Sequence, residues 1–224
     1  MRLLGLRNRP RSAAARAYKE AKPPSSTMSW REARFAVVDL ETTGLYPEHD
    51  EIVSFASVPI DGGRVVVGGI RTALVRPAMM PGAETIRIHG LRPADLAEAP
   101  PLADVLDSIF EALAGRVLVA HAAWVERGFL GRALKPAGVR LAEPVLDTAV
   151  LARRVLEPGS GDDVEAMPLS DAAHGLGLPI HRPHVAEGDA LTTAQLFLAL
   201  ATHLNRAAPQ TVGSLARLSG EPGG

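Results

Sequence analysis

The chain has 224 residues, of which 46% are apolar, enough for one globular domain of ordinary size. It contains no cysteine, which excludes a disulfide framework, a zinc site with thiolate ligands and a thiol nucleophile. Because it also lacks the long apolar stretch of a membrane span or a secretory signal, we expect a soluble, cytoplasmic protein that does not enter a membrane.

Charge is distributed unevenly along the chain. Residues 1–30 contain seven Arg or Lys against one Glu, whereas the remaining residues carry a net negative charge. A domain that holds duplex DNA by neutralising phosphates usually has a basic body. The acidic body of this chain instead favours carboxylates that gather to hold cations.

The two ends of the chain differ from its centre. Residues 1–31 are rich in Arg, Ala, Pro and Ser and have no apolar period, which predicts a disordered basic arm. This arm is either a phosphate-binding tail or a solvated extension, and Met28 offers an alternative start. Residues 32–206 are the predicted folded domain, and residues 207–224 are a short tail. This tail is rich in Gly and Pro and has no long partner-binding segment.

Three strands open the predicted domain, at residues 35–40, 51–60 and 65–75. They are apolar and rich in β-branched side chains, as strands usually are. The sequence Asp61-Gly62-Gly63 between the last two predicts a tight hairpin, because glycine supplies the positive φ that such turns need. The domain therefore starts with three antiparallel strands.

Helices and strands alternate after this start. Apolar residues at a helical period predict helices at 101–113, 124–134, 148–156, 169–176 and 188–204, with short strands at 117–120 and 145–146. Residues 157–167 have no period and predict a loop. This order is expected for an α/β fold in which a mixed sheet, antiparallel at first and then parallel, carries helices on both faces.

Two carboxylates stand at the end of the first strand. Residues two apart in a strand point to the same side, so Asp39 and Glu41 project together. Two carboxylates held this close repel each other unless a cation or a proton lies between them, which is typical of a metal site. The alternative is that both are solvated and that Thr42–Gly44 simply forms a turn.

A histidine and a carboxylate follow near the C-terminus. Asp189 lies in the first turn of the last predicted helix, where the helix dipole stabilises its charge. His184 lies on the preceding loop, from which it can approach the same point and accept a proton from a water molecule. Taken alone, Asp189 is equally explained as a stabiliser of the helix N-terminus.

Two further acids lie between these segments. Glu126 falls in the first turns of the predicted helix 124–134, where an ordinary exposed position explains it equally well. Asp147 directly precedes the helix 148–156, and N-capping accounts for it without any chemistry.

Together these segments resemble the DnaQ-like, or DEDDh, 3′-to-5′ exonucleases, a family that includes the proofreading (epsilon) subunit of bacterial DNA polymerase III. The resemblance covers about residues 33–205 and implies a ribonuclease-H-like fold. The sequence does not support attachment to a polymerase, because the tail after residue 206 has no long partner-binding segment. The histidine form of the last motif applies here, because position 185 is Val where the sister group has Tyr. The matching segments, in chain order, are Asp39-Leu40-Glu41-Thr42-Thr43-Gly44, Ile88-His89-Gly90-Leu91, Asp147-Thr148, Leu151-Ala152-Arg153, and His184 with Asp189.

The second motif departs from the family pattern. The family usually has His-Asn-x-x-Phe-Asp, and this chain has Ala122 in place of the Asn and Glu126 in place of the Asp. The carboxylate is therefore kept, one methylene further from the backbone. We expect reduced or manganese-preferring activity, and the alternative is an inactive module of the same fold that binds nucleic-acid ends.

The resemblance implies hydrolysis of a phosphodiester at a 3′ end with two Mg²⁺ or Mn²⁺ ions, releasing 5′-nucleoside monophosphates. The implied metal ligands are Asp39, Glu41, Asp189 and Glu126, and His184 is the implied general base. His181 is an alternative base. Because a histidine base must be neutral, activity is expected to rise from acid toward mildly alkaline pH.

The resemblance also implies contacts to the substrate. Thr42 matches a family residue beside the terminal nucleotide, Leu45 matches one that wedges against its base, and His89 lies in the matching segment Ile88-His89-Gly90-Leu91. Turn, core and backbone-capping roles explain these residues equally well, and Trp124 is either a stacking platform or core. The expected substrate is a single-stranded DNA or RNA 3′ end, with trimming of short RNA as an alternative, because the sequence does not separate the two.

Overall fold

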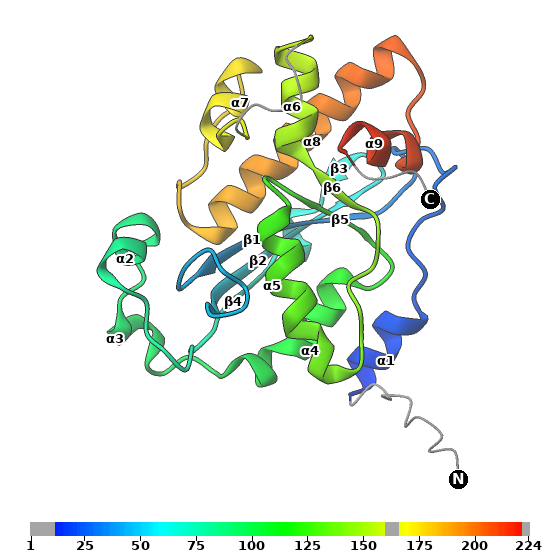
Figure 1. Ribbon diagram of the computed structural model, residues 1–224. Coiled ribbons are helices and arrows are strands. Elements are labelled where there is room, and N and C mark those ends of the chain that lie inside the picture. The colour runs from blue at the N-terminus through cyan, green and yellow to red at the C-terminus, as the bar shows by residue number, and fades with distance from the viewer. Residues whose placement is uncertain (1–11, 160–165, 221–224) are drawn as a thin grey trace.

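A six-stranded mixed sheet lies at the centre of the described residues of the computed structural model, which are 12–159 and 166–220 (Figure 1). Its order is β3-β2-β1-β5-β6, with β4 also beside β2. β1 runs antiparallel to β2 and parallel to β5, and β5 runs parallel to β6. The strands are β1 (Phe35–Thr42), β2 (Ile52–Asp61), β3 (Arg64–Val65), β4 (Arg71–Leu74), β5 (Val117–Ala120) and β6 (Val145–Asp147). The predicted antiparallel start and parallel continuation are confirmed.

The predicted third strand is divided in two. β3 and β4 are separated by a 3₁₀ turn, η1 (Val67–Gly69), because the Gly68-Gly69 pair interrupts the strand. The predicted hairpin is present: Gly62 and Gly63 have φ of 60° and 69°, the left-handed values that a two-residue hairpin turn requires.

Helices flank the sheet and follow the predicted periods closely. The short helices α2 and α3 lie in a region where no helix was predicted, since each is too short to show a clear apolar period. The helices are α1 (Ala13–Glu20), α2 (Ala83–His89), α3 (Pro93–Leu96), α4 (Leu102–Leu113), α5 (Trp124–Leu134), the 3₁₀ turn η2 (Lys135–Ala137), α6 (Thr148–Leu156), α7 (Leu169–Gly175), α8 (Ala186–Ala207) and α9 (Val212–Leu218).

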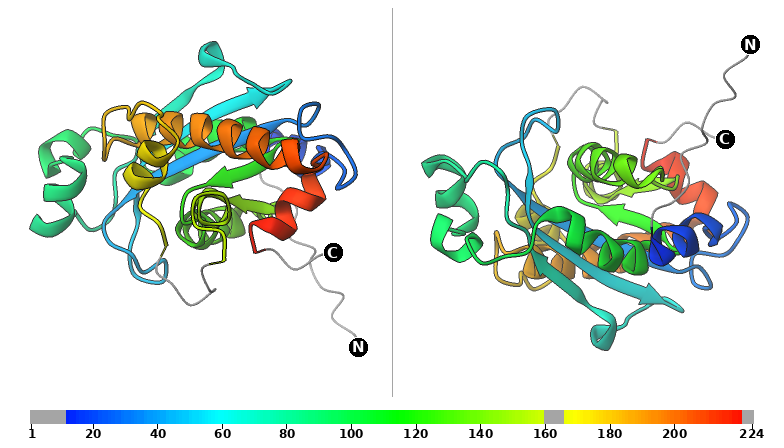
Figure 2. Two further views of the ribbon diagram at one scale, coloured as in Figure 1. Left: turned by 90° about the horizontal axis from the view of Figure 1, so that it is seen from above. Right: turned by 90° about the horizontal axis from the view of Figure 1, so that it is seen from below.

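The sheet buries both of its faces, as Figure 2 shows from above and below. Phe35 and Val37 of β1 pack toward α6, α7, α8 and α9, whereas Ala36 and Val38 pack toward α1, α4 and α5. The side chains of a strand alternate between its faces, so an almost fully apolar β1 is the expected sequence for a strand covered on both sides. The carboxylates at its end are therefore the exception along this strand.

The predicted disordered arm is wrong from residue 12 onward, and residues 1–11 lie outside the described part of the chain. Residues 13–20 form α1, whose Tyr18 is buried with its ring 5.5 Å from that of Phe110 in α4. Trp30 is also buried, and its indole N–H donates to Asn205. Two aromatic anchors among many small and basic residues were enough to dock this segment, although they create no period.

The predicted C-terminal tail also differs from the structure. Residues 212–218 form α9, whose N-terminus is closed by a capping box between Thr211 and Ser214. Val212 and Leu215 are buried, so this segment completes the core over β6. Residues 221–224 lie outside the described part of the chain. No helix in the described ranges combines the length and apolar character that crossing a membrane requires.

Candidate active site

Three carboxylates from two distant segments meet at the end of β1. Asp39 and Glu41 project from the last residues of that strand, and Asp189 comes from the first turn of α8. One oxygen from each lies within 4.8 Å of the others. α8 packs against β1 and β2, which brings its N-terminus to this edge of the sheet. The sequence prediction placed these three side chains together, and the structure does the same.

Burial and mutual repulsion raise the proton affinity of this cluster. Loss of solvent raises the pKa of Asp39 well above its usual range, and the negative charge of Glu126 adds to the shift. Burial and the charge of Asp189 raise the pKa of Glu41 to about 7. Burial also raises the pKa of Asp189, opposed by the main-chain N–H of His184. A bound cation would relieve this repulsion, because its positive charge compensates the negative charges that solvent no longer screens.

Glu126 reaches the same cluster from the first turn of α5. Its side chain is 3% exposed, and its Oε2 atom is buried without a hydrogen-bond partner among the described residues. Burial raises its pKa to about 8, and the charge of Asp147 contributes. Glu126 does not belong to the group whose oxygens all lie within 4.8 Å of one another. A buried carboxylate oxygen with no partner fits a site completed by a cation.

Asp147 does more than cap a helix. Its carboxylate accepts the main-chain N–H of Ala149 at 2.8 Å, which is the predicted N-cap of α6. It also accepts the N–H groups of Ala122 and Ala123 at 3.2 and 2.9 Å. These bonds hold a turn in which Ala122 has a φ of 56° directly before α5. Asp147 therefore fixes the start of the helix that carries Glu126.

The loop after β1 is closed by its own polar side chains. The Thr42 hydroxyl donates to the carbonyl of Gly44, and the Thr43 hydroxyl donates to Asp50 at 3.0 Å. A Cβ atom on Gly44 would lie 2.4 Å from the Asp50 carboxylate, so a side chain here would displace Asp50 from its hydrogen bonds to Thr43 and to the main-chain N–H of Tyr46. Thr42 therefore has the turn-forming role that the sequence offered as the alternative to substrate binding.

Leu45 and His89 occupy different environments beside this loop. Leu45 is 59% exposed, which leaves it free to contact a ligand, and so is the neighbouring Tyr46 at 70%. His89 is buried, and its Nδ1 accepts the N–H of Leu91, which is the capping role foreseen as its alternative. Burial lowers the pKa of the His89 imidazole and favours its neutral form.

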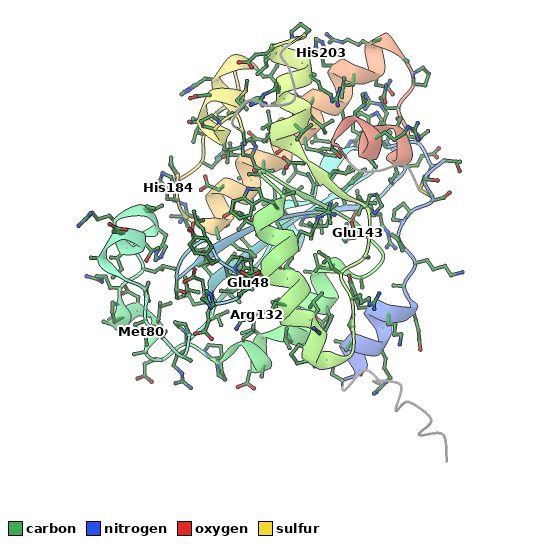
Figure 3. All side chains as sticks on the ribbon, in the orientation of Figure 1. Glu48, Met80, Arg132, Glu143, His184 and His203 are labelled. Atoms are coloured by element: carbon green, nitrogen blue, oxygen red, sulfur yellow. The ribbon has the colours of Figure 1, made fainter. Side chains whose placement is uncertain are left out.

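His184 lies on the loop that enters α8 (Figure 3). It is exposed, has a φ of 59°, and its main-chain N–H donates to Asp189 Oδ2 at 2.8 Å. The loop comes this close because Gly188 has no side chain: a Cβ there would lie 2.3 Å from the carbonyl oxygen of His181. His181 itself has a buried Nε2 and its main-chain N–H donates to Thr192, so it is less available than His184.

Sequence reasoning missed several residues that shape the site. Glu51 accepts the N–H groups of Ala78 and Met79 at 2.7 and 3.1 Å, which holds the segment leading to α2. His121, the first residue of the second motif, is half-buried and hydrogen-bonds through its two ring nitrogens to Thr148 and to the carbonyl of Met167. His121 stands at a motif position, but its two partners, like those of Glu51, are revealed only by the contacts of the folded chain.

The sequence matches the family model described as Exonuclease (RNase T) over residues 36–197. It is 37% identical over 184 residues to a DNA polymerase III subunit epsilon-like protein of Rhodobacter capsulatus, covering 81% of this chain and 25% of that protein. It is 31% identical over 188 residues to the 3′-5′ exonuclease DinG of Bacillus subtilis, covering 83% of this chain and 19% of that protein. The chain therefore spans a quarter or less of the length of these two relatives.

Solved structures share the fold. Exonuclease X in complex with 5′-overhanging duplex DNA superposes with a TM-score of 0.62 at 24% identity, covering 83% of this chain and 99% of that one. Exonuclease I of E. coli in complex with a dT13 oligonucleotide superposes with a TM-score of 0.64 at 18% identity, covering 78% and 42%. At these identities the likeness extends to the fold alone.

Proposed function

The chain belongs to the DnaQ-like 3′-to-5′ exonucleases of the RNase T family, and we propose that it hydrolyses single-stranded nucleic acid one nucleotide at a time with the help of divalent cations. The observation that carries this proposal is the convergence of Asp39, Glu41 and Asp189, whose oxygens lie within 4.8 Å of one another. The Exonuclease I structure, which contains a dT13 oligonucleotide, supports a single-stranded substrate.

The donor set fits hard divalent cations. The three clustered acids and Glu126 all offer carboxylate oxygens, the ligands that Mg²⁺ and Mn²⁺ prefer. Asp39, Glu41 and Asp189 would hold the ions directly, and Glu126 would support them from its buried position. Two such ions, when bound, would stabilise the negative charge that develops on the scissile phosphate.

His184 is the proposed general base. Its exposed position on the loop before α8 allows it to approach a water molecule above the carboxylates. Transfer of a proton from this water to His184 would accompany attack of the water oxygen on phosphorus. The P–O3′ bond then breaks, the 3′ oxygen takes a proton from solvent, and a 5′-nucleoside monophosphate leaves.

The test is digestion of 5′-labelled single-stranded DNA and RNA by the purified chain with Mg²⁺, Mn²⁺ or a chelator. An Asp39→Ala variant serves as the inactive control. We expect a ladder that shortens from the 3′ end only for the natural sequence and only with metal. Equal behaviour of both proteins would contradict the proposal and favour a binding module that has lost turnover.

Comparison of the two nucleic acids in the same assay decides the substrate class. A strong preference for RNA would replace the DNA assignment with the trimming of short RNA. Exposed Leu45 and Tyr46 beside the cluster suit contact with unpaired terminal bases, and they tolerate either sugar.

A further inference from the structure

A groove with a basic lining lies between α1 and the segment that follows η2. Its volume is about 380 Å³, and its lining includes Lys19 and Lys22 from the N-terminal segment and Arg140 from the other wall. None of the described residues that line it is acidic. We call these three cations and the hollow between them the basic groove.

The walls of the basic groove are joined by a specific contact. Tyr18 is buried between them, and its hydroxyl oxygen accepts the main-chain N–H of Ala142 at 2.8 Å. On its other side, the Tyr18 ring packs against Phe110 of α4. The hollow is therefore a fixed feature of the fold, because one aromatic anchor holds α1 against both the helix beneath it and the opposite wall.

Its three cations are available to an anionic ligand. Lys19, Lys22 and Arg140 are exposed, and among the described residues none of them forms an ion pair. Glu143 directly follows Ala142 of the opposite wall, but its carboxylate pairs with Arg127 at 3.5 Å and not with a cation of the groove. The rest of the domain is acidic in sequence, so a local cluster of unpaired cations is a distinct electrostatic feature.

The basic groove is remote from the carboxylate cluster. In the view of Figure 3, His184 and Glu143 lie on opposite sides of α5. α5 begins at Trp124, beside the site, and its 11 residues lead through η2 to the groove. A helix of this length spans about 16 Å, so a ligand that touches both places must be longer than a single nucleotide.

We propose that the basic groove binds the phosphodiester backbone of the nucleic acid whose 3′ end lies in the active site. This inference rests on the proposed function for the identity of the polymer. Contact with phosphates alone is independent of base and sugar, so the groove would add affinity for any long strand without adding sequence specificity.

The test compares the natural chain with a triple variant, Lys19→Ala/Lys22→Ala/Arg140→Ala. Binding of labelled single strands of about 30 nucleotides, DNA and RNA in parallel, is measured in chelator over a range of salt concentrations. We expect the variant to bind both at least tenfold more weakly at low salt, and the slope of log K against log salt to fall by about 2, since each lost phosphate contact contributes about 0.7.

A second triple variant, Arg64→Ala/Arg71→Ala/Arg217→Ala, controls for net charge. It removes three exposed cations that lie elsewhere on the molecule. We expect it to keep the natural salt slope. Circular dichroism and thermal melting of both variants show whether the fold is kept, and a third variant, Lys19→Arg/Lys22→Arg/Arg140→Lys, restores charge and should restore binding.

Hydrolysis of a short substrate separates this inference from the proposed function. Cleavage of a trinucleotide, too short to reach the groove, should be equal in all four proteins, whereas cleavage of the long strand should slow only in the groove variant. A protein that cleaves neither substrate but shows the groove-dependent salt slope would refute the proposed function and leave this inference standing. Equal salt slopes for the two triple variants, or competition by polyglutamate as effective as by unlabelled DNA, would overturn it.

Discussion

The main-chain N–H of His184 donates a 2.8 Å hydrogen bond to the Oδ2 atom of Asp189, so the proposed general base and the proposed metal ligand constrain each other. Burial raises the pKa of Asp189, and the hydrogen bond from the main-chain N–H of His184 opposes this rise because it stabilises the charged carboxylate. The tight turn that makes it possible depends on Gly188, against which the carbonyl groups of the preceding loop are packed.

Replacement of Gly188 by alanine should therefore damage the site through the backbone. The new Cβ would lie 2.3 Å from the carbonyl oxygen of His181, so the loop that carries His184 must move away. We expect activity to fall at least tenfold, with a loss of stability of about 1–3 kcal/mol.

Gly131→Ala in α5 is the matched control, because its Cβ meets nothing within 4 Å. It should gain about 0.5–1 kcal/mol and keep full activity. Chemical denaturation and a nuclease assay on both variants decide the matter, and equal effects would contradict this account of the loop.

The backbone conformation of Ala122 leads us to expect a stabilising substitution at this position. Its φ of 56° costs an L residue about 1–2 kcal/mol, and Asp147 holds it in this conformation through a hydrogen bond to its N–H. Glycine adopts this conformation without strain, although it loses more entropy on folding. Ala122→Gly should therefore raise the free energy of unfolding by about 0.5–1 kcal/mol. The neighbouring Ala123 has an ordinary helical φ of −57°, so Ala123→Gly should lower it. Urea denaturation of the pair tests the prediction, and a loss at both positions would contradict it.

The carboxylate cluster predicts how stability depends on pH without metal. The pKa of Glu41 rises from its ordinary value of 4.5 to about 7, and that of Glu126 rises to about 8. Between the unfolded and folded pKa values, the folded state holds protons that the unfolded state has released. These groups therefore weaken the fold progressively as pH rises from about 4.5 to about 8. Added Mg²⁺ should raise the melting temperature most at the alkaline end.

Thermal melting in chelator from pH 5 to pH 9 measures this effect. Glu41→Gln should flatten the decline because the neutral amide has no proton to lose. Glu32→Gln, at an exposed position outside the cluster, should leave the curve unchanged. A natural protein whose melting temperature rises steadily toward pH 9 in chelator would show that the cluster is not under the repulsion described.

The common direction of Asp39 and Glu41 was predictable from strand alternation, and their convergence with Asp189 was predictable only from the resemblance to the exonuclease family. The secondary roles were not. Thr42 binds its own turn, and Asp147 reaches across to the start of α5, and both depend on which loops meet in space. The docking of α1 was missed for a related reason: Tyr18 is one aromatic residue in a basic, small-residue segment, and its burial needs a partner far along the chain.

Replacement of Glu126 is expected to change stability and activity in opposite directions. Its buried carboxylate has one oxygen without a partner among the described residues, so its negative charge lowers the free energy of unfolding of the metal-free protein. Glu126→Gln keeps the size and removes the charge. We expect it to melt at a higher temperature than the natural chain at pH 9 in chelator, and to lose at least tenfold in metal-dependent hydrolysis. Loss of both stability and activity would assign Glu126 to the fold alone.

Glu126→Asp tests the length of this side chain directly. Aspartate restores the family's residue but removes one buried methylene, which should cost about 0.5–1.5 kcal/mol in unfolding free energy. If the longer side chain sets the ions imperfectly, the ratio of Mg²⁺-supported to Mn²⁺-supported turnover should rise in this variant. Turnover is measured at saturating metal, with Glu126→Gln as the charge-free reference. A fall in turnover with both metals would show instead that the surrounding site has adapted to glutamate.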